Sequence, residues 1–356
     1  MNTSRSCAVK TAFYLALILA WWMWIPRGLE AATPSEAALS FLRSRVGPAG
    51  LLDSFVEDRT DYSYTYDNAL AAMAFLSAGD RASAQRVLDG LVGIGPVPGG
   101  GFLHRYRTTG ASAGGILAAG HNAYLLQALN LFSWRTSDHR YDGIARGIAD
   151  FLLTLQDSAD GGLFGRIGVA WKSTENNLAA YSALNNLALV QNLPAYGTRA
   201  AQIEDFLVRD CWNGAWFLTG KSDPTIVTDV QALGTQVLGV GYANGSFWVE
   251  SYTKATQRYS GKKQVTGFDL NTDRDTVWTE GTLQQALAFW LASDNARFGF
   301  YRTEAEKLRQ SSGAFWAASN RGTTGFGEFF ERWQAVAPTA WYLLVSNRDN
   351  VLGLLP

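Results

Sequence analysis

The sequence predicts an all-α protein built as a toroid of six inner and six outer helices. Three observations support this prediction. A short polar opening that leads directly into a helix recurs six times along the chain. Each helix after an opening is apolar on nearly every side, whereas each helix before one is amphipathic. The repeat runs through almost all of the 356 residues, which favours a single domain.

The six openings follow one another at a nearly constant distance. Counted at Asp67, His121, Glu175, Asp229, Glu280 and Pro338, they are 54, 54, 54, 51 and 58 residues apart. A period held this closely indicates a repeat protein, whose units bury their apolar faces only by stacking. The openings are Thr65-Tyr66-Asp67-Asn68, Gly120-His121-Asn122, Thr174-Glu175-Asn176-Asn177, Thr228-Asp229-Val230-Gln231, Thr279-Glu280-Gly281-Thr282 and Ala337-Pro338-Thr339-Ala340.

The helices on the two sides of each opening differ in their pattern. Residues 177–190 are apolar or small at almost every position, as are residues 68–76, so both helices must be covered on all sides. The helices before the openings set apolar residues at three- and four-residue intervals against charged ones, which is typical of a half-buried helix. These outer helices are expected at 34–45, 80–93 and 138–155, and at about 198–209, 246–258 and 300–317.

The lengths of the connections orient the toroid. Connections from an inner to an outer helix are short, whereas those from an outer to an inner helix are long and rich in glycine and aromatic residues. Connections of this length in a compact domain are usually functional. They all lie at the end where the inner helices begin, so this end is predicted to be the working face. The long connections span 46–64, 94–119, 156–173, 210–227, 259–278 and 318–336.

The first 31 residues have the pattern of a secretory signal peptide. Residues 12–25 form an apolar run that is too short for an ordinary membrane span, and a basic residue precedes it. We therefore expect a secreted or periplasmic protein with one domain at 32–356. An uncleaved membrane anchor is the alternative, because Trp21, Trp22 and Trp24 suit a membrane interface.

Charge and cysteine content exclude several classes of function. Without residues 1–31 the formal charge changes from −1 to about −3, with 27 basic against 30 acidic residues. Nucleic-acid binding needs a concentrated basic surface, and none is visible. Cys7 lies in the predicted signal peptide, so Cys211 stands alone and no intrachain disulfide forms. We expect no metal, no cofactor and no membrane contact after cleavage, and a monomeric protein.

Four acidic residues at the openings are the candidate catalytic groups. A carboxylate at a helix start also has a structural explanation, because it interacts favourably with the helix dipole. In a ring, however, the inner helix starts aim at one central depression, where several carboxylates would shift one another's pKa. The candidates are Glu280, Asp67, Asp229 and Glu175.

The candidate substrate-binding residues are aromatic and polar side chains at the openings and in the long connections. Aromatic faces stack on the C–H faces of sugar rings, while acids, amides and arginines bond their hydroxyls, so a carbohydrate is the expected ligand. The structural alternative is that most of these aromatic residues hold the long loops on the body of the protein. The candidates are Tyr64, Tyr66, Asn68, His121, Asn122, Tyr124, Asn176, Trp171, Trp278 and Trp333.

The six openings and the alternating helices resemble the (α/α)6 barrel of the six-hairpin glycosidases. The resemblance covers the chain after residue 31 and rests on its repeat, not on a family signature. It implies a cleft at the inner-helix N-termini and hydrolysis that is commonly inverting, with one carboxyl as acid and another as base. We expect Glu280 to be the acid because Trp278 supplies an apolar wall. Asp67 is the first choice for the base, and Asp229 and Glu175 compete with it.

Two other classes of function remain open from the sequence. A polysaccharide lyase would use His121 or Tyr124 to take a proton, with Asn122 and the nearby Arg105 and Arg107 neutralising a uronate. His121 has a structural alternative as a simple helix cap. A non-catalytic protein that binds glycans or assists exopolysaccharide assembly is the second alternative.

Overall fold

The computed structural model describes residues 32–356, and the predicted signal peptide at 1–31 lies outside the described residues. The chain separates into Met1–Thr33 and a compact unit at Pro34–Pro356. Within the described residues no helix combines the length and the apolar character that a membrane span requires.

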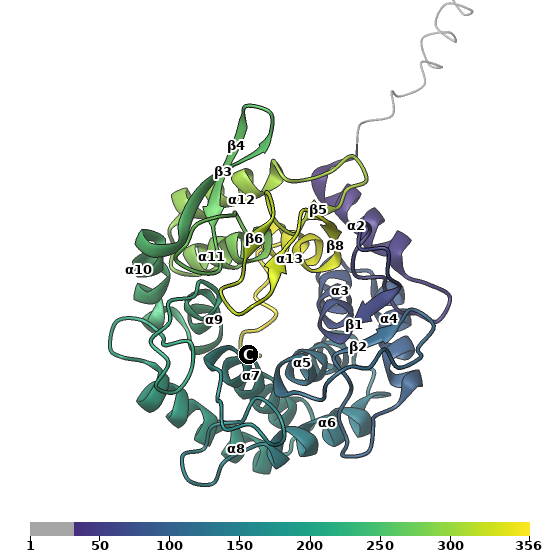
Figure 1. The fold of residues 1–356 in the computed structure, drawn as a ribbon. Helices are drawn as coiled ribbons and strands as arrows, with labels where there is room; N and C mark the ends of the chain where they lie inside the picture. Colours follow the sequence, from purple (N-terminus) through teal and green to yellow (C-terminus); the bar gives the residue numbers. More distant parts are fainter. Residues whose placement is uncertain (1–31) are drawn as a thin grey trace, which may run out of the picture. The chain divides into compact units, whose positions relative to one another are not determined.

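Twelve α-helices of this unit form two concentric rings (Figure 1), which confirms the predicted all-α toroid. Each inner helix packs against the next, and α13 packs against α3 and closes the ring. The inner helices are α3 (Thr65–Ser77), α5 (Ala119–Thr136), α7 (Thr174–Val190), α9 (Asp229–Leu238), α11 (Thr279–Leu291) and α13 (Val336–Ser346). The outer helices are α2 (Pro34–Arg45), α4 (Arg81–Ile94), α6 (Asp142–Thr154), α8 (Pro194–Phe206), α10 (Asn244–Thr253) and α12 (Asn295–Glu306).

Burial follows the two sequence patterns. Nearly every residue of α3 and α13 and most residues of α7 are buried, whereas α4 buries only one face, through Ala84, Val87, Leu88 and Leu91. Full burial of one leucine or valine contributes roughly 1.5–3 kcal/mol, so the inner ring holds most of the hydrophobic stabilisation. Single-turn irregularities follow two helices, a π-helix at Leu207–Cys211 and a 3-10 helix at Val240–Tyr242.

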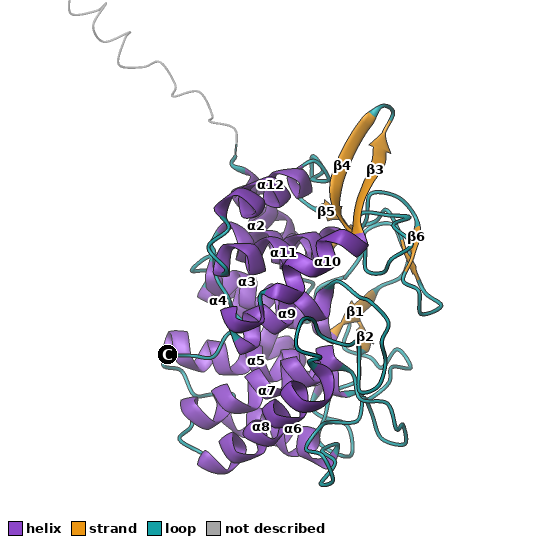
Figure 2. Ribbon diagram, turned by 90° about the vertical axis from the view of Figure 1, so that its left-hand side faces the viewer, coloured by secondary structure: helices purple, strands orange, loops and turns teal. Residues whose placement is uncertain are grey.

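The long connections all lie on the face where the inner helices begin, as predicted (Figure 2). They carry four two-stranded antiparallel sheets that the sequence analysis did not predict. The pairs are β1 (Tyr62–Tyr64) with β2 (Arg105–Arg107), β3 (Lys254–Ser260) with β4 (Lys263–Phe268), β5 (Phe315–Trp316) with β8 (Gln334–Ala335), and β6 (Gly322–Thr323) with β7 (Phe329–Phe330).

Two predicted outer helices, at 138–155 and about 198–209, begin instead at Asp142 and Pro194, and two others end well before the predicted residue. The helix expected at about 246–258 ends at Thr253, because the next residues alternate between exposed and buried and pair as the β3–β4 hairpin. The helix expected at about 300–317 is α12, which begins earlier because Asp294 caps it by accepting a hydrogen bond from the Arg297 N–H. It ends at Glu306, before a turn in which Gly313 takes a positive φ.

One polar side chain on each inner helix holds the preceding long loop. Each of these six side chains accepts a hydrogen bond from a buried backbone N–H of that loop, and all but one also donate to a backbone carbonyl at their own helix start. Gln231 instead donates to the carbonyl of the loop residue that it holds. We call these six residues the clasps. They are Asn68, Asn122, Asn177, Gln231, Thr282 and Thr339.

The clasps define the register of the repeat better than the acidic residues do. The residue two positions before each clasp is Tyr66, Gly120, Glu175, Asp229, Glu280 and Ala337. Asp67 and His121 come one residue later in this register, although the sequence analysis counted them with the three acids. One residue turns a helix by about 100°, so Asp67 is expected to point away from the direction that the other three acids share.

Removing one clasp should destabilise the fold without touching the candidate site. In Asn177→Ala the buried N–H of Leu163, now 2.7 Å from the Asn177 Oδ1, loses its acceptor. We expect the free energy of unfolding to fall by about 1–3 kcal/mol, measured by chemical denaturation. The exposed Asn244 is a matched control, and Asn244→Ala should change it by less than about 0.5 kcal/mol. Equal effects of the two variants would contradict the role of the clasps.

The chain's last residues cross the end of the ring opposite the long loops (Figure 1, label C). Gln127, Ser182 and Asn186 on inner helices donate hydrogen bonds to the carbonyls of Val351, Leu352 and Gly353, at 2.6, 2.6 and 3.0 Å. This segment covers the inner ring at that end.

Candidate active site

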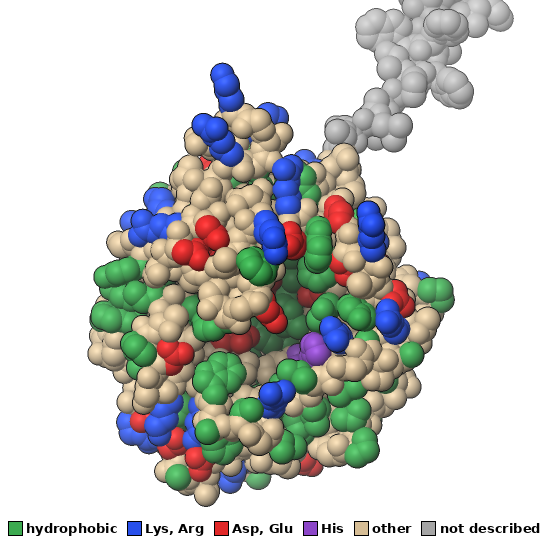
Figure 3. Space-filling model, viewed as in Figure 1, with side chains coloured by type: hydrophobic (Ala, Val, Ile, Leu, Met, Phe, Trp, Pro, Cys, Tyr) green, Lys and Arg blue, Asp and Glu red, His purple; other side chains and the backbone are tan. Residues whose placement is uncertain are grey.

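The face of the long loops is hollowed near its centre (Figure 3). Two adjoining hollows lie there. The central hollow has a volume of about 440 Å³ and the side hollow about 540 Å³. Both are lined by Tyr66, Trp278, Glu280, Glu328 and Phe330, so Glu280 lies at their boundary. Aromatic walls with a few converging polar groups are what a small-molecule site requires.

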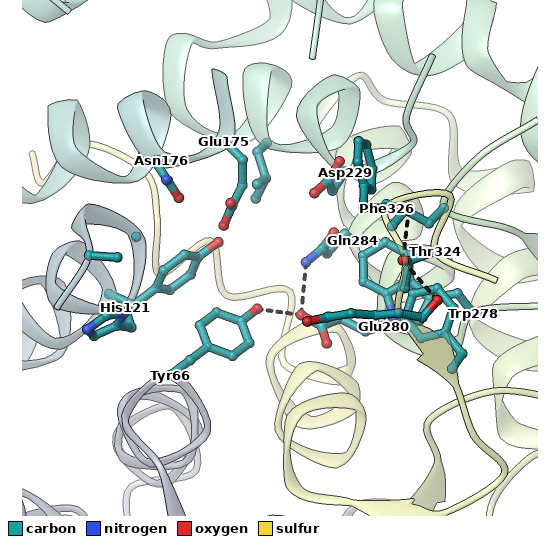
Figure 4. Close-up of a pocket in the computed structure, with 17 residues that line it drawn as sticks. Tyr66, His121, Glu175, Asn176, Asp229, Trp278, Glu280, Gln284, Thr324 and Phe326 are labelled. Carbon is teal, nitrogen blue, oxygen red and sulfur yellow. Dashed lines mark hydrogen bonds between the residues drawn. The ribbon is translucent and has the colours of Figure 1, made fainter. Parts of the chain in front are cut away.

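Three carboxyl groups reach the central hollow from the N-termini of three consecutive inner helices (Figure 4). They are Glu175 on α7, Asp229 on α9 and Glu280 on α11, and each is only half-buried. No lysine or arginine lines this hollow. The three acids sit at the same repeat position, two residues before a clasp, so the register of the fold itself brings them together.

Glu280 is held by a hydrogen-bond network on one side. The Tyr66 hydroxyl donates to Glu280 Oε1 and accepts from Trp341 Nε1 at 3.3 Å, while Gln284 Nε2 donates to the same Oε1 at 3.3 Å. Burial raises the pKa of Glu280 to about 8, the bond from Tyr66 partly offsets this, and the charges of Asp67 and Asp229 raise the pKa further. The group therefore favours its protonated form at neutral pH.

Trp278 forms a wall beside Glu280, as the sequence analysis expected. Its ring stacks on Phe330 with centroids 5.3 Å apart, and both rings line the two hollows. Gly281 makes this position possible, since a Cβ there would lie 2.2 Å from the indole. An apolar wall of this kind lowers the local dielectric and favours the neutral carboxyl.

The other two acids of the hollow have different environments. Burial raises the pKa of Asp229 only to about 6, because the backbone N–H of Val230 donates to its Oδ1 at 2.8 Å and opposes the shift. Burial raises the pKa of Glu175 to about 8, and the nearby charges of Asp229 and Glu280 add to the shift. Asp229 is thus the acid of the three that ionises first.

Asp67 does not join the three acids, which corrects the sequence-based grouping. It is buried and lines the side hollow, not the central one. Burial raises its pKa to about 7, partly offset by a hydrogen bond from Ser54. Asp67 lies one residue later in the clasp register than the three acids, and one residue turns the helix by about 100°.

The other predicted binding residues divide into three groups. Lining the central hollow are Tyr66, His121, Tyr124, Asn176 and Trp278. Tyr64 and Trp333 line the side hollow.

Asn68, Asn122 and Trp171 lie outside both hollows, which corrects their assignment as substrate contacts. Asn68 and Asn122 are fully buried, and their amides hold loop backbone as clasps. Trp171 is 50% exposed and lines a separate surface depression with Phe164 and Lys172.

Some residues of the site were missed from the sequence. Gln284 lies one helical turn after Glu280, and this spacing was a usable signal. Thr324, Phe326, Glu328 and Phe330 come from the connection that carries β6 and β7, and no feature of the repeat marks them. Gly120 also contributes, because a Cβ there would lie 2.4 Å from Asn176 Oδ1 and displace that amide.

The histidine and tyrosine of the lyase alternative are held in neutral forms. Burial lowers the pKa of His121 to about 4, and its Nε2 lies 2.8 Å from the carbonyl oxygen of Phe102. Burial raises the pKa of the Tyr124 hydroxyl well above its ordinary value, and the charge of Glu175 adds to the shift. Tyr124 also packs edge-on against Tyr66, with centroids 4.6 Å apart.

One group of side chains could hold a metal ion, away from the two hollows. Carboxylate oxygens of Asp269, Asp273 and Asp275 lie within 4.8 Å of one another, the only such group found in residues 32–356. The backbone N–H groups of Thr276 and Thr323 donate to Asp269 and Asp275, at 3.1 Å and at 3.1 and 3.0 Å. The group therefore has a structural role in joining two loops whether or not an ion binds.

Comparison with known proteins identifies the fold. No family model matches the chain, and no curated protein matches its sequence. A glycosidase superimposes with a TM-score of 0.69 over 91% of this chain and 97% of its own, at 13% identity. D-mannose isomerase gives 0.67 over 89% and 95%, at 12% identity. A bacterial glucoamylase complexed with acarbose gives 0.68 over 91% of this chain and 56% of its own, at 14% identity. The fold is thus six-hairpin glycosidase-like, and an isomerase among these structures means that fold alone does not decide the reaction.

Proposed function

We propose that the protein is a secreted or periplasmic glycoside hydrolase that cleaves a poly- or oligosaccharide, acts as a monomer and inverts the anomeric configuration. The observation that carries the proposal is the set of three carboxyls in one aromatic-walled hollow, with pKa values pushed apart by their surroundings. Separated pKa values are what acid and base roles in one site require. The matching structures of a glycosidase and a glucoamylase agree with this chemistry.

In this mechanism Glu280 is the general acid and Asp229 the general base. Protonated Glu280 gives its proton to the glycosidic oxygen as the bond from that oxygen to the anomeric carbon breaks. Ionised Asp229 takes a proton from a water molecule, whose oxygen forms the new bond to the anomeric carbon from the opposite face. Both products are neutral sugars. Glu280 has lost one proton to the leaving oxygen, and Asp229 has gained one from the water molecule. Solvent exchange restores the starting states.

The choice of Asp229 as base replaces Asp67, the first choice from the sequence. Asp67 shares the side hollow with Glu280 but is almost fully buried, whereas Asp229 is only half-buried and shares the central hollow with Glu280 and Glu175. The Val230 N–H at the start of α9 stabilises the Asp229 carboxylate, so Asp229 is ionised at a pH where Glu280 keeps its proton.

The lyase alternative has less support. Glu175, Asp229, Glu280 and Glu328 line the central hollow without a cationic side chain, so a uronate would meet negative charge there. Arg105 lines only the side hollow, where its guanidinium packs over the Tyr62 ring at 4.7 Å. No observation specifically favours a non-catalytic role.

A panel of polysaccharides tests the proposed function. The chain without residues 1–31 is incubated with each substrate, and both new reducing ends and absorbance near 235 nm are followed, since unsaturated uronates absorb there. We expect new reducing ends without absorbance. Reducing ends together with absorbance would identify a lyase, and binding without either product would identify a glycan-binding protein.

The pH profile of kcat/KM should be a bell with limbs set by the two carboxyls. Asp229 must be ionised, so activity should fall as pH drops through about 6. Glu280 must be protonated, so activity should fall as pH rises through about 8. Because the acids interact, the two limbs report the site as a coupled set. An acid limb near the ordinary pKa of aspartate would show that the hollow does not raise the pKa of the base.

A further inference from the structure

A surface depression outside the two hollows is lined by residues of the connections before α7 and α9. It has a volume of about 450 Å³, and its lining includes Phe164, Trp171, Lys172, Lys221 and Ser222. Both connections lie on the face of the long loops, as the candidate active site does (Figure 2). We call it the Trp171 depression. The mechanism above assigns no role to it.

Trp171 is half exposed, yet its position is fixed by two glycines. Gly165 lies against the ring, since a Cβ there would be 2.7 Å from the indole, and the Gly165 N–H donates to the Trp171 carbonyl at 2.9 Å. Gly220 lies beside the indole nitrogen, where a Cβ would be 3.4 Å from Nε1. An aromatic ring that is already held in place loses little conformational freedom when a ligand packs on it.

The charged side chains of the depression neutralise one another. Lys172 is 5% exposed, and its Nζ donates to Asp157 and Asp160 at 2.7 and 2.6 Å. The Lys221 Nζ donates to the other oxygen of Asp160 at 2.6 Å. Two carboxylates and two ammonium groups leave the lining without net charge, so a charged ligand has little electrostatic advantage there.

The depression keeps polar groups that suit hydroxyls. A carboxylate can accept more hydrogen bonds than these lysines supply, and the exposed Ser222 hydroxyl both donates and accepts. A fixed aromatic ring beside uncharged or charge-balanced polar groups is the environment in which a neutral sugar packs its C–H face and bonds its hydroxyls.

The Trp171 depression also lies close to the central hollow along the chain. Trp171 precedes Glu175 by four residues, and four residues of extended chain span at most roughly 14 Å. One polysaccharide chain is therefore long enough to contact both places.

We propose that the Trp171 depression is an accessory binding site for an uncharged polysaccharide, with the Trp171 indole as the surface on which one sugar ring stacks. Binding there holds the polysaccharide beside the central hollow and raises the local concentration of its glycosidic bonds. The inference rests on the proposed function only in taking a polysaccharide as the ligand. Packing of the two loops is the competing role for Trp171.

Binding by a protein that does not cut its ligand tests the inference. The chain without residues 1–31 and with Glu280→Gln is run in native gels that contain starch, β-glucan, xylan, mannan or dextran, with alginate as a charged comparison. We expect at least one uncharged polysaccharide to retard the protein, and Trp171→Ala to weaken that binding by about tenfold or more. Retardation by no uncharged polysaccharide, or retardation that Trp171→Ala leaves unchanged, overturns the inference. Binding of alginate alone, or binding that added salt abolishes, overturns the assignment to an uncharged ligand.

Two further variants separate stacking from a general effect of an exposed tryptophan. Trp134 is 43% exposed near the end of α5, away from the long loops, so Trp134→Ala should change the binding by about twofold or less. Trp171→Phe keeps an aromatic face and should bind more tightly than Trp171→Ala. Equal losses in Trp134→Ala and Trp171→Ala would contradict a site at Trp171. Circular dichroism checks that each variant is folded.

Kinetics distinguish failure of the inference from failure of the proposed function. In the active protein Trp171→Ala should raise KM for the polysaccharide by about tenfold at unchanged kcat, and should leave hydrolysis of a nitrophenyl glycoside unchanged, because this small substrate needs only the central hollow. Hydrolysis of the polysaccharide with an unchanged KM overturns the inference and leaves the hydrolase. Binding that depends on Trp171, in a protein that hydrolyses no polysaccharide, overturns the hydrolase and supports the inference.

Discussion

Glu280→Gln is expected to lower kcat on a natural polysaccharide by about 10²–10⁴-fold, the usual contribution of a general acid. The amide cannot give a proton to the glycosidic oxygen, which must then leave as an alkoxide. The Tyr66 hydroxyl and the Gln284 amide can still donate to the amide oxygen, so the fold should be retained. Circular dichroism and thermal unfolding of the variant check that the loss is chemical.

A substrate with a good leaving group separates this role from a general loss of the site. Nitrophenolate leaves with little protonation, so Glu280→Gln should lose only about tenfold or less on a nitrophenyl glycoside. An equal loss on both substrates would show that Glu280 does not act as the acid. The alkaline limb near pH 8 should also disappear in the variant, because it reports the protonation of Glu280.

The fold was predictable because its signal is repeated. The pair of an inner helix that is apolar on all sides and an outer helix with one apolar face occurs six times. A helix whose own pattern is ambiguous can therefore be assigned from the equivalent helices in the other repeats. The exceptions are local. The β3–β4 hairpin replaces the end of one predicted helix, since strand pairing within a connection leaves no trace in the period. Residues after α12 were misassigned for the same reason.

The part of the site that the repeated helix starts position was predictable from the sequence, and the rest was not. Glu175, Asp229 and Glu280 come from equivalent helix starts, and the sequence analysis grouped them. Their grouping with Asp67 was wrong by one residue, because acidic character marks the register less reliably than the clasps do. Asn68 and Asn122 were taken for ligand contacts since an amide that holds a buried loop and one that holds a sugar look alike in sequence.

The walls of the hollow depend on contacts that no local pattern encodes. Phe330 and Trp278 are far apart in the chain and meet because the loop with β6 and β7 folds over the hollow. The residues of that loop do not recur in the other five long connections, so the period gives no information about which of them line the hollow. The sequence predicts aromatic residues at the working face but does not indicate which of them line the hollow.

Asp229→Asn is expected to lower kcat by about 10²–10⁴-fold on both the natural polysaccharide and the nitrophenyl glycoside. Water must be activated whatever the leaving group, so this variant should not recover on the activated substrate as Glu280→Gln does. Asparagine can still accept the bond from the Val230 N–H, which keeps the start of α9 in place. The acid limb near pH 6 should also vanish, as measured by the pH dependence of kcat/KM.

Asp67→Asn is the matched comparison, because it removes a buried carboxylate from the neighbouring hollow at the start of another inner helix. It should lower kcat much less than Asp229→Asn does. The opposite order would return the base role to Asp67 and would mean that the acidic residues, not the clasps, mark the functional register of the toroid. Since the two positions differ by one residue in that register, the pair of variants tests whether helix rotation decides which carboxyl meets the substrate.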